Sequence, residues 1–302
     1  MKAGAVVKTV IVPLDGSQAA EQALPVARLI AGRHDAKLKL VSVVEVTAEF
    51  DAWIETAPFS LEDEFDSWLA ERRAYLSAVA NRLGNGVESE VRVGRPADEI
   101  RASVEELDDV VVAIASHGRG GLQQLVLGSV ALKVIHDVHS PVIAVHIQDD
   151  EAAAPAAPES VLLPTDGSEF SESIIERALE VIGEPKPQLH LVRVMETPSW
   201  GLAPQDAGLV GQYLESTREM NEQHLAKLAD ELRQRGYEVT AELRDGKPGD
   251  QILGSAAERH ADMIAMATHG RGGIGRLLLG SVAQHVLHRT EIPLLLIRPQ
   301  TG

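Results

Sequence analysis

Hydrophobic and polar positions follow two kinds of pattern along this chain, and the two kinds alternate. Short apolar runs rich in β-branched residues, such as Val110–Ala115, are typical of strands buried on both faces of a sheet. Longer segments with apolar residues three and four positions apart, such as Leu61–Leu83, are typical of helices that pack one face on a sheet. The alternation predicts parallel strands joined by crossover helices.

Both halves of the chain show the same order of elements. In the first half the expected strands are Val10–Leu14, Leu38–Val46, Val87–Val93, Val110–Ala115 and Pro141–Ile147, and the expected helices are Gln18–Arg33, Leu61–Leu83, Pro96–Leu107 and Ser129–Val138. In the second half the strands are Val161–Pro164, Leu189–Val194, Tyr237–Leu243, Met263–Ala267 and Pro293–Ile297, and the helices are Ser171–Ile182, Tyr213–Arg235, Pro248–His260 and Ser281–His288. We therefore expect an α/β protein with two tandem doubly wound, Rossmann-like domains. Each would hold a five-stranded parallel sheet with helices on both faces.

A tandem duplication explains this order, because landmarks of the first half recur 151 or 152 positions later in the second. The matched landmarks are VIVPLDGS (Val10–Ser17) with VLLPTDGS (Val161–Ser168), Asp15 with Asp166, Gly94-Arg95-Pro96 with Gly246-Lys247-Pro248, Gly118 with Gly270, and Gly128 with Gly280. The predicted domains are residues 1–147 and 161–302. Residues 148–160, rich in Ala, Pro and acidic residues, are the predicted linker.

Composition narrows the classes of function. The formal net charge of −17 opposes binding to nucleic acid and to anionic membranes, although backbone amides at a helix start still attract a small anion. The chain has no cysteine, which excludes disulfides, thiolate catalysis and cysteine-based zinc sites. No apolar run is long enough for a signal peptide or for a membrane span of roughly 18 residues, so we expect a cytoplasmic protein.

The candidate site lies in ASHGRGGLQQLVLGSVA (residues 115–131), which has a near copy at residues 267–283. A buried strand delivers the chain to the carboxyl edge of the sheet, where His117-Gly118-Arg119-Gly120-Gly121 forms a loop that permits close approach to a ligand. Gly128-Ser129 then begins a helix whose free amides and dipole favour an anion, and Arg119 adds a charged donor. These features predict a phosphate-binding loop. Asp15, at the same edge, is suited to ribose hydroxyls or to Mg²⁺ beside phosphates.

Other motifs compete less well. The P-loop motif needs a lysine directly before its serine or threonine. Here a glycine precedes the serine, and Leu127 and Leu279 precede that glycine. The GxGxxG match at residues 270–275 follows the fourth strand of its unit, and Gln123 replaces the third glycine in the first copy. The HxxH spacings at His136/His139 and His285/His288 are out of register between the copies, which favours solvated helix faces over metal ligation. No hydrolase motif of the HExxH, GxSxG or SxxK type is present.

These motifs carry a resemblance: the sequence resembles the universal stress protein family over nearly all of both halves. The family's ATP-binding signature is Gly-x-x-Gly, nine residues, then Gly-Ser or Gly-Thr. Gly118 is followed after nine residues by Gly128-Ser129, and Gly270 likewise by Gly280-Ser281. The first signature glycine is replaced by Ala115 and by Ala267, which adds one methyl group where the nucleotide approaches the backbone.

The resemblance implies a role for each matched residue. Asp15 and Asp166 correspond to the family's strand-end aspartate, Val43 and Val194 to the position that packs on adenine, and Ile114 and Met266 to the position beneath the base. Phosphate contacts are implied from Gly118, Gly128, Ser129 and Val130, and from Gly270, Gly280, Ser281 and Val282. The complete expected nucleotide site adds Pro13, Leu14, Ala115, His117 and Arg119 in the first half, and Pro164, Thr165, Ala267, His269 and Arg271 in the second.

The expected ligand is ATP, ADP or AMP with Mg²⁺ held through Asp15 and Asp166, and a cyclic nucleotide stays an alternative. The expected function is a nucleotide-responsive stress regulator with at most slow ATP hydrolysis, because no side chain is placed as a general base. The alternative is a protein-interaction or chaperone-like module with vestigial sites. Its candidate surfaces are residues 50–60 and 200–211, in or near which lie Trp53, Trp68 and Trp200. The last strands would otherwise be apolar edges, and the resemblance implies that they pair within the chain as a pseudo-dimer. Association of two chains is a further expectation.

Overall fold

A computed structural model describes residues 7–46, 60–84, 86–115, 128–146, 158–196, 207–268 and 279–298. The chain divides into two compact units, and the main division follows residue 155. Each unit is an α/β structure, and each is described by itself. The predicted domain limits, the pairing of the last strands within the chain, the association of two chains and the cytoplasmic location stay predictions.

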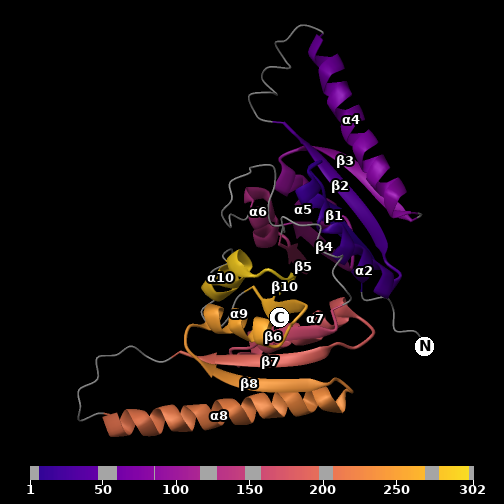
Figure 1. Ribbon diagram of the computed structural model, residues 1–302. Coiled ribbons are helices and arrows are strands. Elements are labelled where there is room, and N and C mark those ends of the chain that lie inside the picture. The colour runs from indigo at the N-terminus through magenta and orange to yellow at the C-terminus, as the bar shows by residue number, and fades with distance from the viewer. Residues whose placement is uncertain are drawn as a thin grey trace. The chain divides into compact units, whose positions relative to one another are not determined.

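The first unit contains parallel strands in the order β3-β2-β1-β4-β5 (Figure 1). Its strands are β1 (Thr9–Pro13), β2 (Lys37–Glu45), β3 (Val87–Gly94), β4 (Val110–Ala115) and β5 (Val142–Val145). Its helices are α1 (Gln18–Glu21), α2 (Leu24–His34), α4 (Ser60–Leu83), α5 (Pro96–Glu105) and α6 (Ser129–Asp137). The chain builds outward from β1 through β2 to β3, then returns to place β4 on the other side of β1, which is the doubly wound pattern.

The second unit repeats this order as β10-β9-β6-β7-β8, again with parallel pairing. Its strands are β6 (Ser160–Pro164), β7 (Gln188–Met195), β8 (Val239–Asp245), β9 (Met263–Ala267) and β10 (Leu294–Ile297). Its helices are α7 (Glu169–Ile182), α8 (Ala207–Gln234), α9 (Pro248–Glu258) and α10 (Ser281–Arg289). The long helix α8 runs along β8 in Figure 1, as α4 packs on β3 in the first unit.

The central strands form the cores of both units. Val10–Val12 of β1 and Val111–Ala113 of β4 are fully buried, as are Val161 and Leu162 of β6 and Ile264 and Ala265 of β9. These strands carry almost no polar residue because they are covered on both faces, which confirms the interpretation of their continuous apolar runs.

One predicted helix is wrong. The segment Gln18–Arg33 was expected as a single helix, but it is divided into α1 and α2, with the break at Gln22 and Ala23. Pro25 explains the break, because it has no N–H to donate to the carbonyl four residues earlier, and it lies in the first turn of α2 where that donor is not needed. In the described part of the chain, no helix is both long enough and apolar enough to cross a membrane.

Candidate functional site

The order of the strands reverses between β1 and β4 in the first unit and between β6 and β9 in the second. These pairs are parallel neighbours, so their carboxyl ends lie at the same edge of each sheet. Ligands of doubly wound sheets bind in the crevice outside such a reversal. Asp15 follows β1 and Asp166 follows β6, so each unit presents one carboxylate at this edge.

The Asp15 carboxylate is held by the turn that follows it. Ser17 donates its backbone N–H (2.9 Å) and its hydroxyl (2.5 Å) to Oδ1 of Asp15, and Ser17 Oγ accepts the N–H of Ala20 (3.1 Å) as the N-cap of α1. Gly16 between them has φ of 85°, a conformation that favours glycine. The second carboxylate oxygen takes no hydrogen bond from any residue that the structure describes. The turn therefore fixes the direction of the carboxylate and leaves one oxygen for a ligand.

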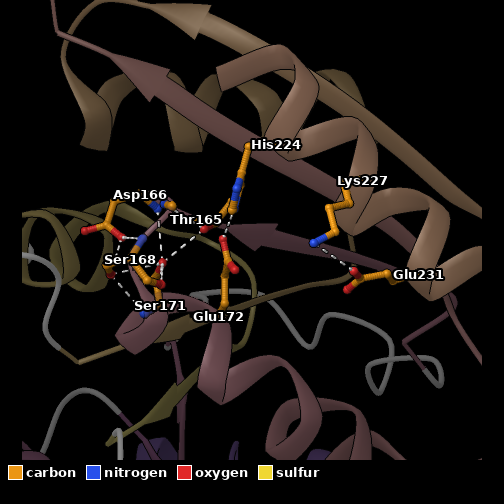
Figure 2. A network of polar contacts seen from close by, with 9 residues as sticks. Thr165, Asp166, Ser168, Ser171, Glu172, His224, Lys227 and Glu231 are labelled. Carbon is orange, nitrogen blue, oxygen red and sulfur yellow. Dashed lines mark hydrogen bonds and ion pairs between the residues drawn. The ribbon is translucent and has the colours of Figure 1, made fainter. Parts of the chain in front are cut away.

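The Asp166 turn repeats this geometry with the same distances. Ser168 donates its N–H (2.9 Å) and its hydroxyl (2.5 Å) to Oδ1 of Asp166 (Figure 2). A buried polar pair lies behind this turn: Oγ1 of Thr165 and Oγ of Ser171 are 3.0 Å apart, and Thr165 Oγ1 accepts the N–H of Gly167 at 3.0 Å. Leu14 and Ala20 hold the matching positions in the first unit, where both are buried apolar residues.

Helices α6 and α10 both begin with Gly-Ser, and the serine that opens each helix is exposed. Gly128 is the N-cap of α6 and Gly280 of α10, and neither helix has a side-chain cap or an acidic residue in its first turn. By contrast, α5, α7 and α9 carry acidic residues in their first turns. Since the first amides of a helix need acceptors and its dipole is positive there, α6 and α10 are suited to an anion. The Gly280 N–H donates to Thr268 O (2.8 Å), which holds the start of α10 against the end of β9.

Other predicted residues lie along the same edge. Val43 and Val194 are half-buried near the ends of β2 and β7. Ile114, Ala115, Met266 and Ala267 end β4 and β9 and are between 5% and 8% exposed, so the alanine methyl groups are packed within the sheet ends. Ser129 and Ser281 are exposed, while Val130 and Val282 are half-buried. Pro13 ends β1, Pro164 ends β6, and Leu14 and Thr165 are buried beside them. His117, Gly118, Arg119, His269, Gly270, Arg271 and the GxGxxG match lie outside the described residues.

Two arginines at this edge were not predicted from the sequence to lie near the site. Arg72 of α4 donates Nη1 to the backbone carbonyl of Asp15. Arg193 of β7 is only 7% exposed, and its guanidinium covers Gly167, where an added Cβ would lie 2.1 Å from Nη1. Arg193 had a detectable signal, since it interrupts an apolar strand at a site where the first copy has Ser42. Arg72 had none, because it is one of many charged residues on an amphipathic helix.

A second contact joins each long helix to the helix that follows the aspartate turn. Tyr75 of α4 donates its hydroxyl to Glu21 Oε1 (3.0 Å), and burial together with this carboxylate raises the pKa of the tyrosine well above its ordinary value. In the second unit, His224 Nε2 of α8 lies 2.5 Å from Glu172 Oε1 of α7 (Figure 2). These contacts set the long helices beside the candidate site in both units.

The outer strands carry an ion network that both units share. Glu242 of β8 accepts from Arg244 Nε (2.9 Å), Arg259 Nη2 (3.0 Å) and Ser255 Oγ. Burial acts to raise the pKa of Glu242, but these donors outweigh it and lower the pKa to about 2. Glu90 and Arg92 form the matching ion pair on β3, with Nε of Arg92 3.0 Å from Glu90 Oε1. We assign this network to stability, because it joins outer strands to α5 and α9.

In the described ranges, no group of three or more His, Cys, Asp or Glu side chains is arranged to hold a metal ion. His285 Nε2 instead lies 2.9 Å from Asp250 Oδ1, an ion pair or hydrogen bond across α9 and α10. The matching positions in the first unit hold Lys133 and Asp98, at 2.7 Å. This contact joins two helices and is not a ligand set.

Comparison with known proteins gives one family for both units. The sequence model of the universal stress protein family matches residues 7–146 and again residues 158–298. A universal stress protein of Mycolicibacterium smegmatis is 27% identical over 304 residues, which cover 96% of this chain and 97% of the relative. A universal stress protein of Mycobacterium tuberculosis is 25% identical over 301 residues and is covered to 96%. The crystal structure of a universal stress protein from Archaeoglobus fulgidus superposes with a TM-score of 0.68 at 21% identity, over 96% of this chain and 98% of that one.

Proposed function

Because the chain belongs to the universal stress protein family and carries its fold twice, we propose that each unit binds one adenine nucleotide and that occupancy regulates the protein in the stress response. One observation carries the proposal: in both units an aspartate turn and an uncapped, acid-free Gly-Ser helix start follow neighbouring central strands. A carboxylate acceptor and a set of free amides suit the two ends of a nucleoside phosphate.

In the first unit the amides of Ser129 and Val130 would bind phosphate oxygens, and the Asp15 carboxylate would accept from the ribose hydroxyls. The base would pack on Val43. Ser281, Val282, Asp166 and Val194 would have the same roles in the second unit. The glycine-rich loops, with His117, Gly118, Arg119, His269, Gly270 and Arg271, complete the proposal from the sequence alone.

Mg²⁺ fits this arrangement as a companion of the phosphates. One oxygen of Asp15 takes no hydrogen bond from a described residue, and carboxylate and phosphate oxygens are the ligands that Mg²⁺ prefers. The ion would screen phosphate charge in a chain of net charge −17. The protein's own contribution is to orient the carboxylate through Ser17 and Ser168.

Calorimetric titration of ATP into nucleotide-stripped protein, with and without Mg²⁺, tests the proposal. We expect two sites per chain. Gly128→Asp and Gly280→Asp are the informative variants, because both glycines have φ of −59°, which other residues adopt, and aspartate is itself a good N-cap. The new carboxylate would take the amides and repel phosphate, so each variant should lose one site and the double variant both.

No heat and no thermal stabilisation by ATP in the parent protein would refute nucleotide binding and favour the protein-interaction alternative. Unchanged affinity in the folded double variant would refute the helix starts as the phosphate sites. Parallel titrations with AMP and cyclic AMP distinguish the class of nucleotide, since a phosphate site of this kind recognises a phosphate group more readily than the number of phosphates.

A further inference from the structure

A guanidinium lies against the Asp-Gly-Ser turn in both units, but the two units supply it from different elements. In the first unit it belongs to Arg72 of the long helix α4, which donates to the Asp15 carbonyl. In the second unit it belongs to Arg193 of strand β7, which covers Gly167. The two arginines are not at equivalent positions of the duplicated sequence, so two different elements supply the same group to the turn.

The contacts fix which residues correspond. Pro13 pairs with Val41 and Pro164 with Val192, so Arg193 holds the position of Ser42 in its strand. Ser42 is fully buried, and its hydroxyl has no hydrogen-bond partner among the described residues.

Tyr75 binds Glu21 as His224 binds Glu172, and both glutamates come four residues after the serine of the turn. Arg72 and Asn221 precede these anchors by three residues, so Asn221 holds the position of Arg72 and is itself buried. Each unit therefore has one arginine and one small polar residue, with the two positions exchanged.

The exchange changes what holds the turn in place. The Asp15 carbonyl belongs to the peptide that leads into Gly16, so the Arg72 hydrogen bond helps set the backbone that directs the carboxylate. This bond exists only while α4 is docked. In the second unit the guanidinium belongs to strand β7 of the sheet itself, and His224 of α8 contacts Glu172 of α7.

We propose that Arg72 and Arg193 are the positioning residues of the two nucleotide sites, and that only the first site is coupled through its arginine to the docking of its long helix. The inference rests on the proposed nucleotide binding. A ligand that needs the Asp15 turn held by Arg72 stabilises the docked position of α4. Because linkage is reciprocal, undocking of α4 lowers the affinity for that ligand by the same factor. The second site has no such dependence on α8.

Hydrogen exchange of the full chain, with and without saturating ATP, measures the coupling directly. We expect ATP to slow exchange of the α4 amides around Arg72 at least about threefold and to leave the α8 amides around Asn221 unchanged. The Gly280→Asp variant, in which the second site is silenced, should retain the α4 response. Gly128→Asp should abolish it.

Substitution of the arginine separates positioning from helix stability. Arg72→Met should weaken ATP at the first site about tenfold, as expected for one charge-assisted hydrogen bond, and should abolish the α4 response while the second site is unchanged. Arg73→Met, at the exposed neighbouring position, is the matched control and should leave affinity and response intact. Arg193→Met should lower the ATP affinity of the second site only. If the methionine variant unfolds, Arg193→Lys is measured in its place.

The outcomes separate the two proposals. Equal protection of α4 and α8 by ATP, or equal affinity of Arg72→Met and Arg73→Met at the first site, would overturn the inference and leave nucleotide binding standing. Absence of ATP binding at both sites in the parent protein would overturn the proposed function and the inference with it.

Discussion

The two units share their frame and differ in what lies behind the aspartate turn. Strand order, the Asp-Gly-Ser geometry and the ion network of the outer strands are kept, while the apolar pair Leu14 and Ala20 is replaced by the hydrogen-bonded pair Thr165 and Ser171. Both solutions satisfy the buried environment, one by excluding polar groups and the other by pairing them. The difference teaches that the same aspartate turn can be supported either by an apolar pair or by a hydrogen-bonded pair.

The largest expected effect comes from placing the arginine of the second unit in the first. Ser42→Arg alone should lower the free energy of unfolding of the first unit by about 3 kcal/mol or more, because it puts a charge and a long side chain at a fully buried position. Urea titration followed by hydrogen exchange of β1 and β4 peptides measures it. The double variant Ser42→Arg/Arg72→Asn should recover much of the loss, and equal stability of single and double variants would contradict the exchange.

A double-mutant cycle on the polar pair should give the next largest effect. Thr165→Leu and Ser171→Ala should each cost about 1–2 kcal/mol, because the first removes the acceptor of the Gly167 N–H and the second removes the hydroxyl that pairs with Thr165. The double variant reproduces the apolar pair of the first unit, so it should cost less than the two single costs together by about 1 kcal/mol. Additive costs, measured by the same exchange method on α7 and β6 peptides, would mean that the two hydroxyls act independently.

The pH dependence of stability should differ between the units through His190. Its ring nitrogens lie 2.7 Å from Thr240 Oγ1 and 3.0 Å from Ser160 Oγ, and burial, with Arg259 nearby, lowers the pKa of the ring below the usual 6.5. The unfolded chain therefore binds the proton more readily than the folded chain. The contribution of neutral His190 to the free energy of unfolding is complete above pH 6.5 and is lost as the pH falls toward the folded-state pKa.

His190→Gln removes the titrating group and should flatten the dependence between pH 7 and pH 5, which has a maximum slope of about 1.4 kcal/mol per pH unit for one proton. The first unit, with Lys39 at the matching position, serves as the internal control. A parent and a variant with the same slope in β7 exchange would rule out His190 as the source.

The smallest effect is expected on the solvent-facing side of α8. Lys227 Nζ lies 3.7 Å from Glu231 Oε1, and the two side chains are 77% and 56% exposed (Figure 2). The first unit has Ala78 and Arg82 at the matching positions of α4. Lys227→Ala should change the free energy of unfolding by no more than about 0.5 kcal/mol, because exposed ion pairs are screened by water and salt. A larger change in chemical denaturation would show that α8 depends on its surface charges.

The sequence was sufficient for the fold because the units are regular. Strands Val110–Ala115 and Met263–Ala267 were predicted to the residue, since a strand covered on both faces must be apolar throughout. The α1–α2 break was missed because helical spacing continues across it, and only the lost hydrogen bond of Pro25 interrupts the backbone.

Residues of the candidate site could be predicted only where the same residue types recur at a fixed spacing in both halves of the sequence. Asp15, Gly128 and their copies recur in register, and the predicted helix starts at Gly128-Ser129 and Gly280-Ser281 are confirmed. Arg72 and Arg193 lie on non-equivalent elements, so comparing the copies position by position conceals that they serve the same turn.

The continuous order of elements along the chain has a consequence for biosynthesis. The strands β1 to β5 of the first unit, through Val145, leave the ribosome before Ser160 begins the first strand of the second, so the N-terminal unit has all of these strands while the other unit is still being made. Two units with the same strand order in one polypeptide are exposed to exchange of equivalent strands. Synthesis in this direction, together with divergent strand sequences such as TVIVP and SVLLP, favours correct assembly of each copy.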